Sequence, residues 1–158
     1  MTRLSRGFFA LLMGLALLSC SACASKPDTT KDEADIQTTL ETFYGAMREG
    51  DNAKAMSMIA QDAQFVESGK LETREQYEMN HLPNDIKFEK QVHGKRGPLR
   101  TRINGDVAWV IAETEFMGKF EEDGAVSDVD FVSSQLAVLS REPEGWRIRS
   151  IHWSSRPR

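Results

Sequence analysis

The sequence predicts an α+β domain in which three N-terminal helices pack on one face of an antiparallel β-sheet. Two observations indicate this class. Up to about residue 80, large apolar residues recur at intervals of three and four, the spacing of amphipathic helices. From residue 86 onward, long segments rich in β-branched and aromatic residues are separated by turn sequences. Helices that precede a connected sheet in the chain usually cover one of its faces.

Residues 1–19 are predicted to be a secretory signal peptide. Arg3 and Arg6 precede an uncharged run over 7–18, which small residues follow. The run is shorter than the ~20 apolar residues that span a bilayer. Leu-Leu-Ser-Cys at 17–20 resembles the lipobox of bacterial lipoproteins, so we expect cleavage before Cys20 and lipidation of its thiol. Ala-Cys-Ala at 22–24 is a competing exit, and cleavage after it would remove both cysteines.

The expected lipid anchor predicts where the protein resides. By resemblance to lipoproteins of bacteria with two membranes, Ser21 after the cysteine indicates the outer membrane. The protein is therefore expected to be exported to the periplasm and to contact the membrane only through its lipid. Residues 20–31 would form the anchor and a flexible polar linker, and residues 32–158 the folded domain.

Composition excludes several classes of function for this domain. The chain has a formal net charge of −4, and removal of a leader with two arginines makes it more acidic. An acidic protein is poorly suited to nucleic acid, because such binding depends on neutralising phosphates with Lys and Arg. No cysteine follows Cys23, so the domain has no disulfide, no thiolate nucleophile and no zinc–cysteine site.

The helical half is predicted from apolar spacing and capping residues. The first helix, over 32–49, carries one apolar stripe and ends at Gly50. The second covers 52–60, and a short strand over 63–67 follows. The third begins at Thr73, where Thr-Arg-Glu-Gln matches the capping box, and runs to about residue 80. Pro83 is expected to prevent its continuation.

Four strands are predicted, at 86–103, 107–120, 126–140 and 146–155. Asn-Gly at 104–105 and Asp-Gly at 123–124 are favoured in tight hairpins, because each pair tolerates positive φ. Glu-Pro-Glu-Gly at 142–145 suits a type I turn. Short turns between consecutive strands imply an antiparallel meander. Pro98 interrupts the first strand and indicates a sheet edge or a bulge there.

The two middle strands are apolar on both faces. Trp109 and Ile111 alternate with Val110 and Ala112, and 131–139 shows the same pattern. One face can pack on the helices, and the other must also be covered or form a patch that invites a partner. We therefore expect a homodimer through the outer face of the sheet.

The last strand predicts a pocket. Uninterrupted alternation puts Trp146, Ile148, Ser150, His152 and Ser154 on one side. Two large apolar residues are followed there by a serine, an imidazole and another serine. A strand that runs from the core into a polar-lined hollow has this pattern.

Four motifs resemble a known family: Glu-Ser-Gly at 67–69, Thr-Arg-x-x-Tyr at 73–77, His-Leu-Pro at 81–83, and Trp-Arg-Ile with His-Trp-Ser within 146–154. Together with the order of elements, they resemble the nuclear transport factor 2-like superfamily. The C-terminal motif is similar to the W-x-I-x-x-x-H-x-S ending of its SnoaL-like branch, which is related to the ketosteroid isomerases. The resemblance covers about residues 32–155. It implies a curved sheet and a cone-shaped cavity between its concave face and the helices.

The same resemblance suggests one catalytic position and removes another. Glu67 lies near where ketosteroid isomerases place their carboxylate base. The oxyanion-hole tyrosine of those enzymes corresponds to Phe43, with Tyr44 one residue later and about 100° away around the helix. A phenyl ring cannot donate a hydrogen bond to a developing enolate, so the isomerase activity itself is not implied.

Polar side chains are expected to converge in the cavity. Glu67, His81 and His152 could provide general acid–base groups, with Tyr77, Trp109 and Ser154 around them as ligand-binding residues: these are the candidate site residues. The same groups could instead form a fully satisfied structural network that fixes the helix on the sheet. Two histidines and one carboxylate could also form a metal-binding facial triad, but the three are scattered in the sequence, and we expect neither a metal nor another cofactor.

Two functions of different class remain open at this stage. The favoured one is an envelope lipoprotein whose cavity binds a small, mostly apolar molecule. The alternative is an enzyme of isomerase, cyclase or hydrolase type, in which Glu67 or His152 moves a proton on a carbonyl substrate. A module that merely dimerises, with a filled cavity, is a third alternative.

Overall fold

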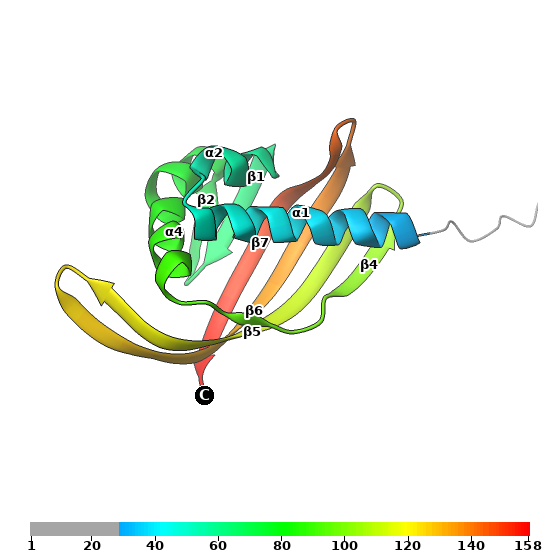
Figure 1. Ribbon diagram of the computed structural model, residues 1–158. Coiled ribbons are helices and arrows are strands. Elements are labelled where there is room, and N and C mark those ends of the chain that lie inside the picture. Colours follow the sequence, from blue (N-terminus) through cyan, green and yellow to red (C-terminus); the bar gives the residue numbers. More distant parts are fainter. Residues whose placement is uncertain (1–28) are drawn as a thin grey trace, which may run out of the picture.

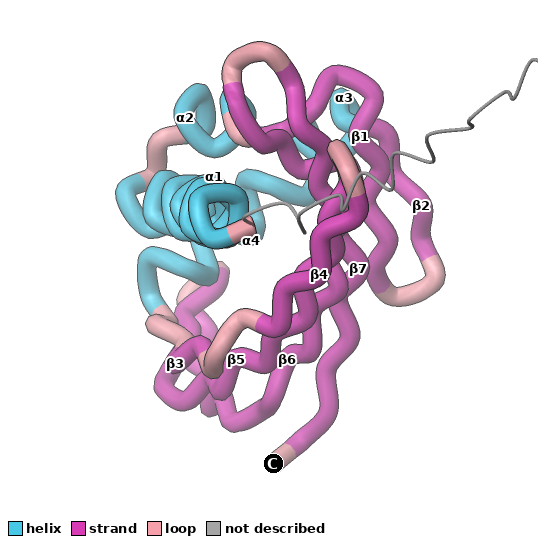
Figure 2. Tube along the Cα trace, turned by 90° about the vertical axis from the view of Figure 1, so that its right-hand side faces the viewer, coloured by secondary structure: helices cyan, strands magenta, loops and turns pink. Residues whose placement is uncertain are grey.

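The structure, a computed structural model, describes residues 29–158. The predicted signal peptide and Cys20 lie outside the described residues. The helices lie on one side of a strongly curved, seven-stranded sheet, and α1 (Thr30–Glu49) crosses its concave face (Figures 1 and 2). The strand order is β2-β1-β7-β6-β5-β3, with β4 also paired to β5. The predicted fold class is confirmed.

The first two helices form much as their sequences predict. In α1 the stripe Ile36, Leu40, Phe43 and Met47 is buried, and the helix ends at Gly50, whose φ of 77° is left-handed. Asp51 then caps α2 (Asn52–Ser57) by accepting a hydrogen bond of 2.9 Å from the backbone N–H of Lys54.

The third helical segment is longer than expected. The capping box at Thr73 opens α3 (Arg74–Gln76), which continues through a π-helical turn (Tyr77–His81) into α4 (Leu82–Gln91). The expectation that Pro83 ends the helix is wrong. Pro83 falls in the first turn of α4, directly after the π-helical turn, where the hydrogen-bond register of the helix changes.

The predicted first strand, 86–103, is therefore mostly not a strand. Its beginning belongs to α4, and only β3 (Lys95–Arg96) and β4 (Arg100–Asn104) remain. Both pair with β5, on either side of the break that contains Pro98. The edge position predicted from this proline is confirmed.

The other strands are β1 (Ile59–Glu67), β2 (Lys70–Thr73), β5 (Val107–Glu122), β6 (Ala125–Glu142) and β7 (Gly145–Pro157). All three predicted turns connect strands as expected. However, the sheet is mixed, because β1 runs parallel to β7. The hairpin between β1 and β2 was not predicted.

A bulge in β7 changes which residues face the cavity. Leu139 of β6 pairs with Ile148, but Val138 pairs with Ser150, so Arg149 is an additional residue. Alternation restarts after it, and Ile151 rather than Ser150 continues the buried side. The prediction that His152 shares a face with Trp146 is therefore wrong.

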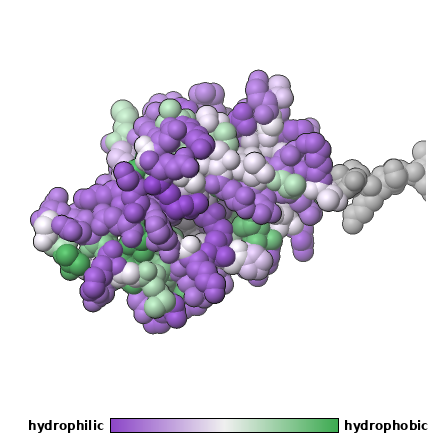
Figure 3. All heavy atoms as spheres, in the orientation of Figure 1, coloured by the Kyte–Doolittle hydropathy of each residue, from purple (hydrophilic) through white to green (hydrophobic). Residues whose placement is uncertain are grey.

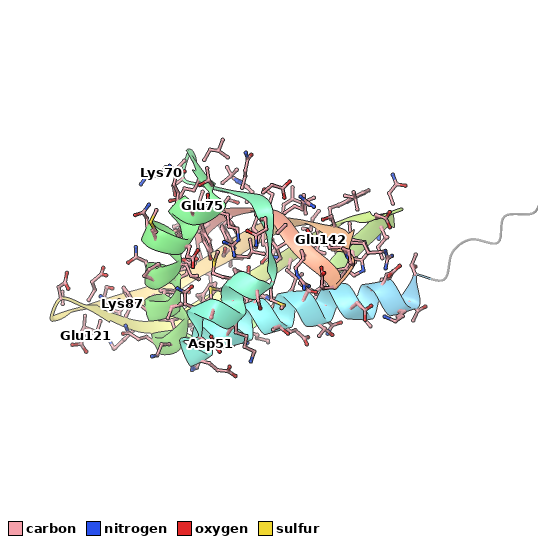
Figure 4. All side chains as sticks on the ribbon, turned by 90° about the horizontal axis from the view of Figure 1, so that it is seen from above. Asp51, Lys70, Glu75, Lys87, Glu121 and Glu142 are labelled. Atoms are coloured by element: carbon pink, nitrogen blue, oxygen red, sulfur yellow. The ribbon has the colours of Figure 1, made fainter. Side chains whose placement is uncertain are left out.

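The hairpin of β5 and β6 extends beyond the body of the protein as a long arm, and α4 lies above the near part of this arm in Figure 1. Lys87 donates a hydrogen bond of 3.0 Å to Glu122, and the Gln91 side chain bonds both backbone groups of Glu121. Figure 4 labels Lys87 on α4 and Glu121 on the arm. The side of the molecule that carries α1 is mainly hydrophilic, with apolar residues exposed chiefly along the arm and below α1 (Figure 3). Over residues 29–158, none of the helices has the length and apolar character that a membrane span requires.

Candidate functional site

A cavity of about 230 Å³ lies between the helices and the concave face of the sheet. It exceeds the roughly 150 Å³ of an engineered apolar cavity that accommodates benzene. Side chains from α1, α4 and β3 close it from above, and β1, β5, β6 and β7 form its floor. Its lining consists of Tyr44, Met47, Glu67, Asp85, Phe88, Glu89, Arg96, Thr114, Phe116, Phe131, Ser133, Gln135, Trp153 and Ser155.

One end of the cavity is aromatic. Phe88 of α4 lies with its ring centroid 5.3 Å from that of Phe116 and 6.0 Å from that of Phe131, which pair across β5 and β6. Trp153 contributes a further ring from β7, stacked 5.9 Å from Phe65 of β1. These walls can hold a flat apolar group by burial and ring contacts.

A charged cluster lies at the opening of the cavity, around His81. Its Nε2 is 2.8 Å from a carboxylate oxygen of Glu67 and 3.4 Å from Asp85, and its Nδ1 is 2.7 Å from Glu72. His81 is the last residue of the π-helical turn, and this position places its ring next to these acids. Tyr77, at the start of the same turn, is fully buried and donates a 2.9 Å hydrogen bond to Asp85.

This environment decides the protonation of His81. Hydrogen bonds to Asp85, Glu67 and Glu72 raise its pKa to about 11, although partial burial opposes the charge. The ring is therefore an imidazolium at neutral pH and cannot accept a proton as a general base. Burial and the adjacent Asp85 raise the pKa of Tyr77 well above its ordinary value, so its phenol stays protonated.

Deeper in the cavity, three side chains form a hydrogen-bonded chain. Trp153 Nε1 donates to the Tyr44 hydroxyl at 3.2 Å, and that hydroxyl donates to Oε1 of Gln135. The guanidinium of Arg96 lies 3.6 Å over the centre of the Tyr44 ring. Burial raises the pKa of the Tyr44 phenol to about 12, so it remains a donor.

Glu89 of α4 lies beside this chain as a buried carboxyl. It is 7% exposed and faces Arg48 at 3.5 Å. Burial raises its pKa, and the positive charges of Arg48 and Arg96 oppose that rise.

The structure brings together only some of the predicted site residues. Glu67 lines the cavity and contacts His81, as predicted, and Tyr77 lies buried behind them. His152, Trp109 and Ser154 lie instead on the outer face of the sheet and are exposed. The bulge at Arg149 accounts for His152 and Ser154. Trp109 alternates with the buried Ala108 and Val110, so it points away from the helices.

The residues that replace them were not singled out in the sequence. Gln135, Asp85 and Arg96 line the cavity, and Trp153 and Ser155 occupy the β7 positions expected for His152 and Ser154. Tyr44 was noted only as the neighbour of Phe43. Gln135 precedes Ala137 and Leu139 on the same face of β6, and this position was an available signal, since an amide on a buried strand face needs a partner.

The two-histidine metal site is not formed, because His81 and His152 lie on opposite faces of the sheet. Over residues 29–158, no group of three His, Cys, Asp or Glu side chains has the arrangement needed to hold a metal ion.

The helices on a curved sheet have the nuclear transport factor 2-like fold, and comparison with known proteins identifies the family. A model of the SnoaL-like domain matches residues 36–157. The chain therefore belongs to the SnoaL-like domain family, as its motifs suggested. No curated protein matches the sequence.

Solved structures share the fold at low sequence identity. A candidate ketosteroid isomerase from Shewanella frigidimarina is 24% identical, with a TM-score of 0.67 over 76% of this chain and 94% of its own. A candidate dehydratase of the NTF2-like family from Streptomyces avermitilis is 18% identical, with a TM-score of 0.61 over 84% and 99%. An NTF2-like superfamily protein from Salmonella enterica is 16% identical, with a TM-score of 0.65 over 82% and 94%. At these identities the likeness concerns the fold.

Proposed function

We propose that the domain binds a small, mostly apolar molecule in the cavity between its helices and its sheet. The observation that carries this proposal is the aromatic wall that Phe88, Phe116 and Phe131 form at one end of the cavity, while polar and charged side chains make up most of the remaining lining. Ligand sites have this character, because apolar contacts supply affinity and a few polar groups supply orientation. The volume of about 230 Å³ suits a molecule of one or two rings.

Native mass spectrometry of protein purified from its own host tests the proposal. The expected result is an additional mass that dissociates on activation, together with a shift in thermal unfolding when the released molecule is added back. The control is the variant Ser133→Phe, in which a larger side chain blocks the cavity. This variant is expected to carry no additional mass. A wild-type protein that retains nothing and whose unfolding no small apolar compound shifts would contradict binding.

A second candidate function is acid–base catalysis, and one observation favours it. Glu67 lines the cavity, and the His81 imidazolium occupies only one of its oxygens, Oε2. The other oxygen has no hydrogen-bond partner among residues 29–158, so it is available to take a proton from a bound carbonyl compound. His81 would then act as a fixed cation that orients Glu67 through the hydrogen bond to Oε2, and His152 would have no part. Loss of turnover in Glu67→Gln with unchanged ligand affinity would distinguish this function from binding alone.

We further propose that the domain is tethered in the periplasm by a lipid on Cys20, to the outer membrane. The support is the lipobox-like sequence at 17–20 and the polar linker that follows. In the native host, Cys20→Ala is expected to move the protein from the membrane fraction to the soluble fraction. Cys23→Ala is expected to leave the protein in the membrane fraction. Cleavage after Ala24, seen by mass spectrometry of the mature protein, would contradict lipidation.

The outer face of the sheet is proposed as the interface of a homodimer. Val107, Trp109, Ile111 and Leu136 are each 38–46% exposed on this face, an unusual number of large apolar side chains for a surface. A second copy would cover them without obstructing the cavity, which opens on the opposite side of the sheet.

A further inference from the structure

The buried amide of Gln135 has a donor with no partner. The residue is 5% exposed, lines the cavity, and its Nε2 is buried without a hydrogen bond within residues 29–158. An unpaired buried donor is destabilising, and nearly all buried polar groups have a partner, so this exception needs an explanation.

Neighbouring hydrogen bonds fix which end of the amide is left over. Trp153 Nε1 can only donate, so the Tyr44 oxygen accepts from it and the Tyr44 proton must go elsewhere. Oε1 of Gln135 accepts that proton. If the amide were turned over, the Tyr44 proton and Oε1 would both lack partners. The observed orientation leaves one unpaired group, and that group is a donor.

A second unpaired donor borders the same space. Nε of Arg96 is buried without a partner within the described chain, while its guanidinium stacks on Tyr44. Two side chains of the cavity lining therefore carry a buried N–H in need of an acceptor. The chain from Trp153 through Tyr44 polarises the Gln135 amide and strengthens its remaining donor.

The charges of the lining disfavour an anionic acceptor. Three acidic side chains, Glu67, Asp85 and Glu89, line the cavity with one basic side chain, Arg96. Arg48 and His81 contact these acids from outside the lining, but with Glu72 the cluster still has four acidic groups against three cationic ones. A carboxylate ligand would bring a further negative charge close to these acids. A neutral carbonyl oxygen satisfies the donors without that repulsion.

We propose that Gln135 Nε2, oriented by Tyr44 and Trp153, is the specificity group that binds the carbonyl oxygen of a neutral, ring-containing ligand. This assignment rests on the proposed function, because it requires that the cavity be filled by a ligand. It also replaces the hydrogen-bond donor that Phe43 cannot supply. In the acid–base alternative, the same N–H would stabilise negative charge that develops on that oxygen.

A matched pair of probes tests the assignment: acetophenone, and α-methylstyrene, in which a CH₂ group replaces the carbonyl oxygen. Titration calorimetry on the purified wild-type domain is expected to show about fivefold tighter binding of the ketone, the value of one hydrogen bond. In Gln135→Met the preference is expected to vanish, while α-methylstyrene binds as before. Gln61→Met, an exposed position on β1, is the matched control and is expected to keep the preference.

An infrared measurement provides a readout that a merely structural role of Gln135 would not move. The C=O stretch of bound acetophenone is expected at lower wavenumber in wild-type protein than in Gln135→Met. Tyr44→Phe is expected to weaken both the shift and the preference, because the amide can then turn its oxygen to the cavity. Thermal unfolding of each variant verifies that it is folded.

The outcomes separate this inference from the proposed function. Equal affinity for both probes would overturn the role of Gln135 and leave the cavity as a binding site. Binding of benzoate more tightly than acetophenone would overturn the neutral carbonyl as the ligand class. Failure of both neutral probes to bind would overturn the inference and contradict the proposed function as well.

Discussion

At the scale of single residues, the protein combines a rigid charged cluster with a donor that has no partner. His81 is held by three carboxylates, and Gln135 is held by Tyr44. The first arrangement is saturated with contacts, whereas the second leaves an N–H available. Saturation indicates a structural role for His81, and availability indicates a recognition role for Gln135.

His81→Gln tests the structural role through its pH dependence. The pKa of His81 is about 11 in the folded state against 6.5 unfolded. Its stabilisation is therefore complete below about pH 6.5 and is lost as pH rises towards 11. We expect the variant to be about 3 kcal/mol less stable than wild type at pH 6, as when one partner of a buried ion pair is removed. The difference should shrink by pH 10. Urea unfolding at both pH values measures it, and a constant difference would contradict the ion-pair account.

Gly94→Ala tests how closely the cavity floor approaches the chain between α4 and β3. A Cβ at this position would lie 2.4 Å from Thr114 Cγ2 and 2.5 Å from Phe116 Cε1. We expect a loss of about 2 kcal/mol in unfolding free energy, the usual cost of overpacking. Gly45→Ala is the control. Gly45 lies within helix α1, and a Cβ added there would have no neighbour closer than 3.9 Å. Alanine at this position should therefore raise the unfolding free energy by about 0.5–1 kcal/mol.

At the scale of elements, α1 is attached to the sheet by ionic contacts as well as by its apolar stripe. Arg141 of β6 makes two parallel hydrogen bonds of 2.7 Å to Asp32 in the first turn of α1. Trp146 Nε1 also donates to Asp32, at 3.3 Å. The bond to Arg141 is the main cause that lowers the pKa of Asp32. A two-pronged guanidinium–carboxylate pair fixes orientation as well as contributing energy.

Asp32→Asn is expected to reduce stability at pH 7, and the reduction should disappear in acid. A lowered carboxyl pKa gives stabilisation that is present above the unfolded value of about 3.9 and is lost as pH falls through the folded value. Wild type and variant should therefore differ in urea midpoint at pH 7 and converge near pH 2. Asp35→Asn, on an exposed part of the same helix, should show a smaller difference at pH 7.

The limits of prediction from sequence also lie at the level of elements. The stripe of α1, the capping box at Thr73 and the three hairpin turns depend on local chemistry, so the sequence alone predicts them. The π-helical turn before Pro83 and the bulge at Arg149 depend on packing between distant segments. No local sequence pattern predicts either of them. The bulge at Arg149 determines which β7 residues line the cavity. Because it adds one residue to the strand, Trp153 rather than His152 faces the cavity.

At the scale of the whole molecule, the two faces of the sheet differ in the side chains that they carry. The concave face holds the cavity, and the convex face carries the exposed row of Val107, Trp109, Ile111 and Leu136. The fold was predictable from helical spacing and turn sequences. The apolar outer face was predictable because apolar residues occupy both faces of the two middle strands. The identity of the residues that line the cavity was not, because it depends on the register between β6 and β7.

The dimer proposal predicts a mass twice that of the domain in light scattering at micromolar concentration. The double variant Ile111→Lys, Leu136→Lys is expected to be monomeric, since two charges opposite each other on the face would have to be desolvated. Met117→Lys on the arm, at 61% exposed, is the control and should remain dimeric. Monomeric wild-type protein under these conditions would contradict the proposal.

The position of β7 in the sheet has a consequence for biosynthesis. This strand is the last element in the chain, yet it lies between β1 and β6 and joins the earliest strand to the meander. Until the ribosome has made it, β1 and β6 both present open edges, and Trp146, Ile148 and Ile151 are missing from the core. A nascent chain that stops at residue 144 therefore cannot close its sheet, and such a fragment would be a substrate for chaperones and proteases.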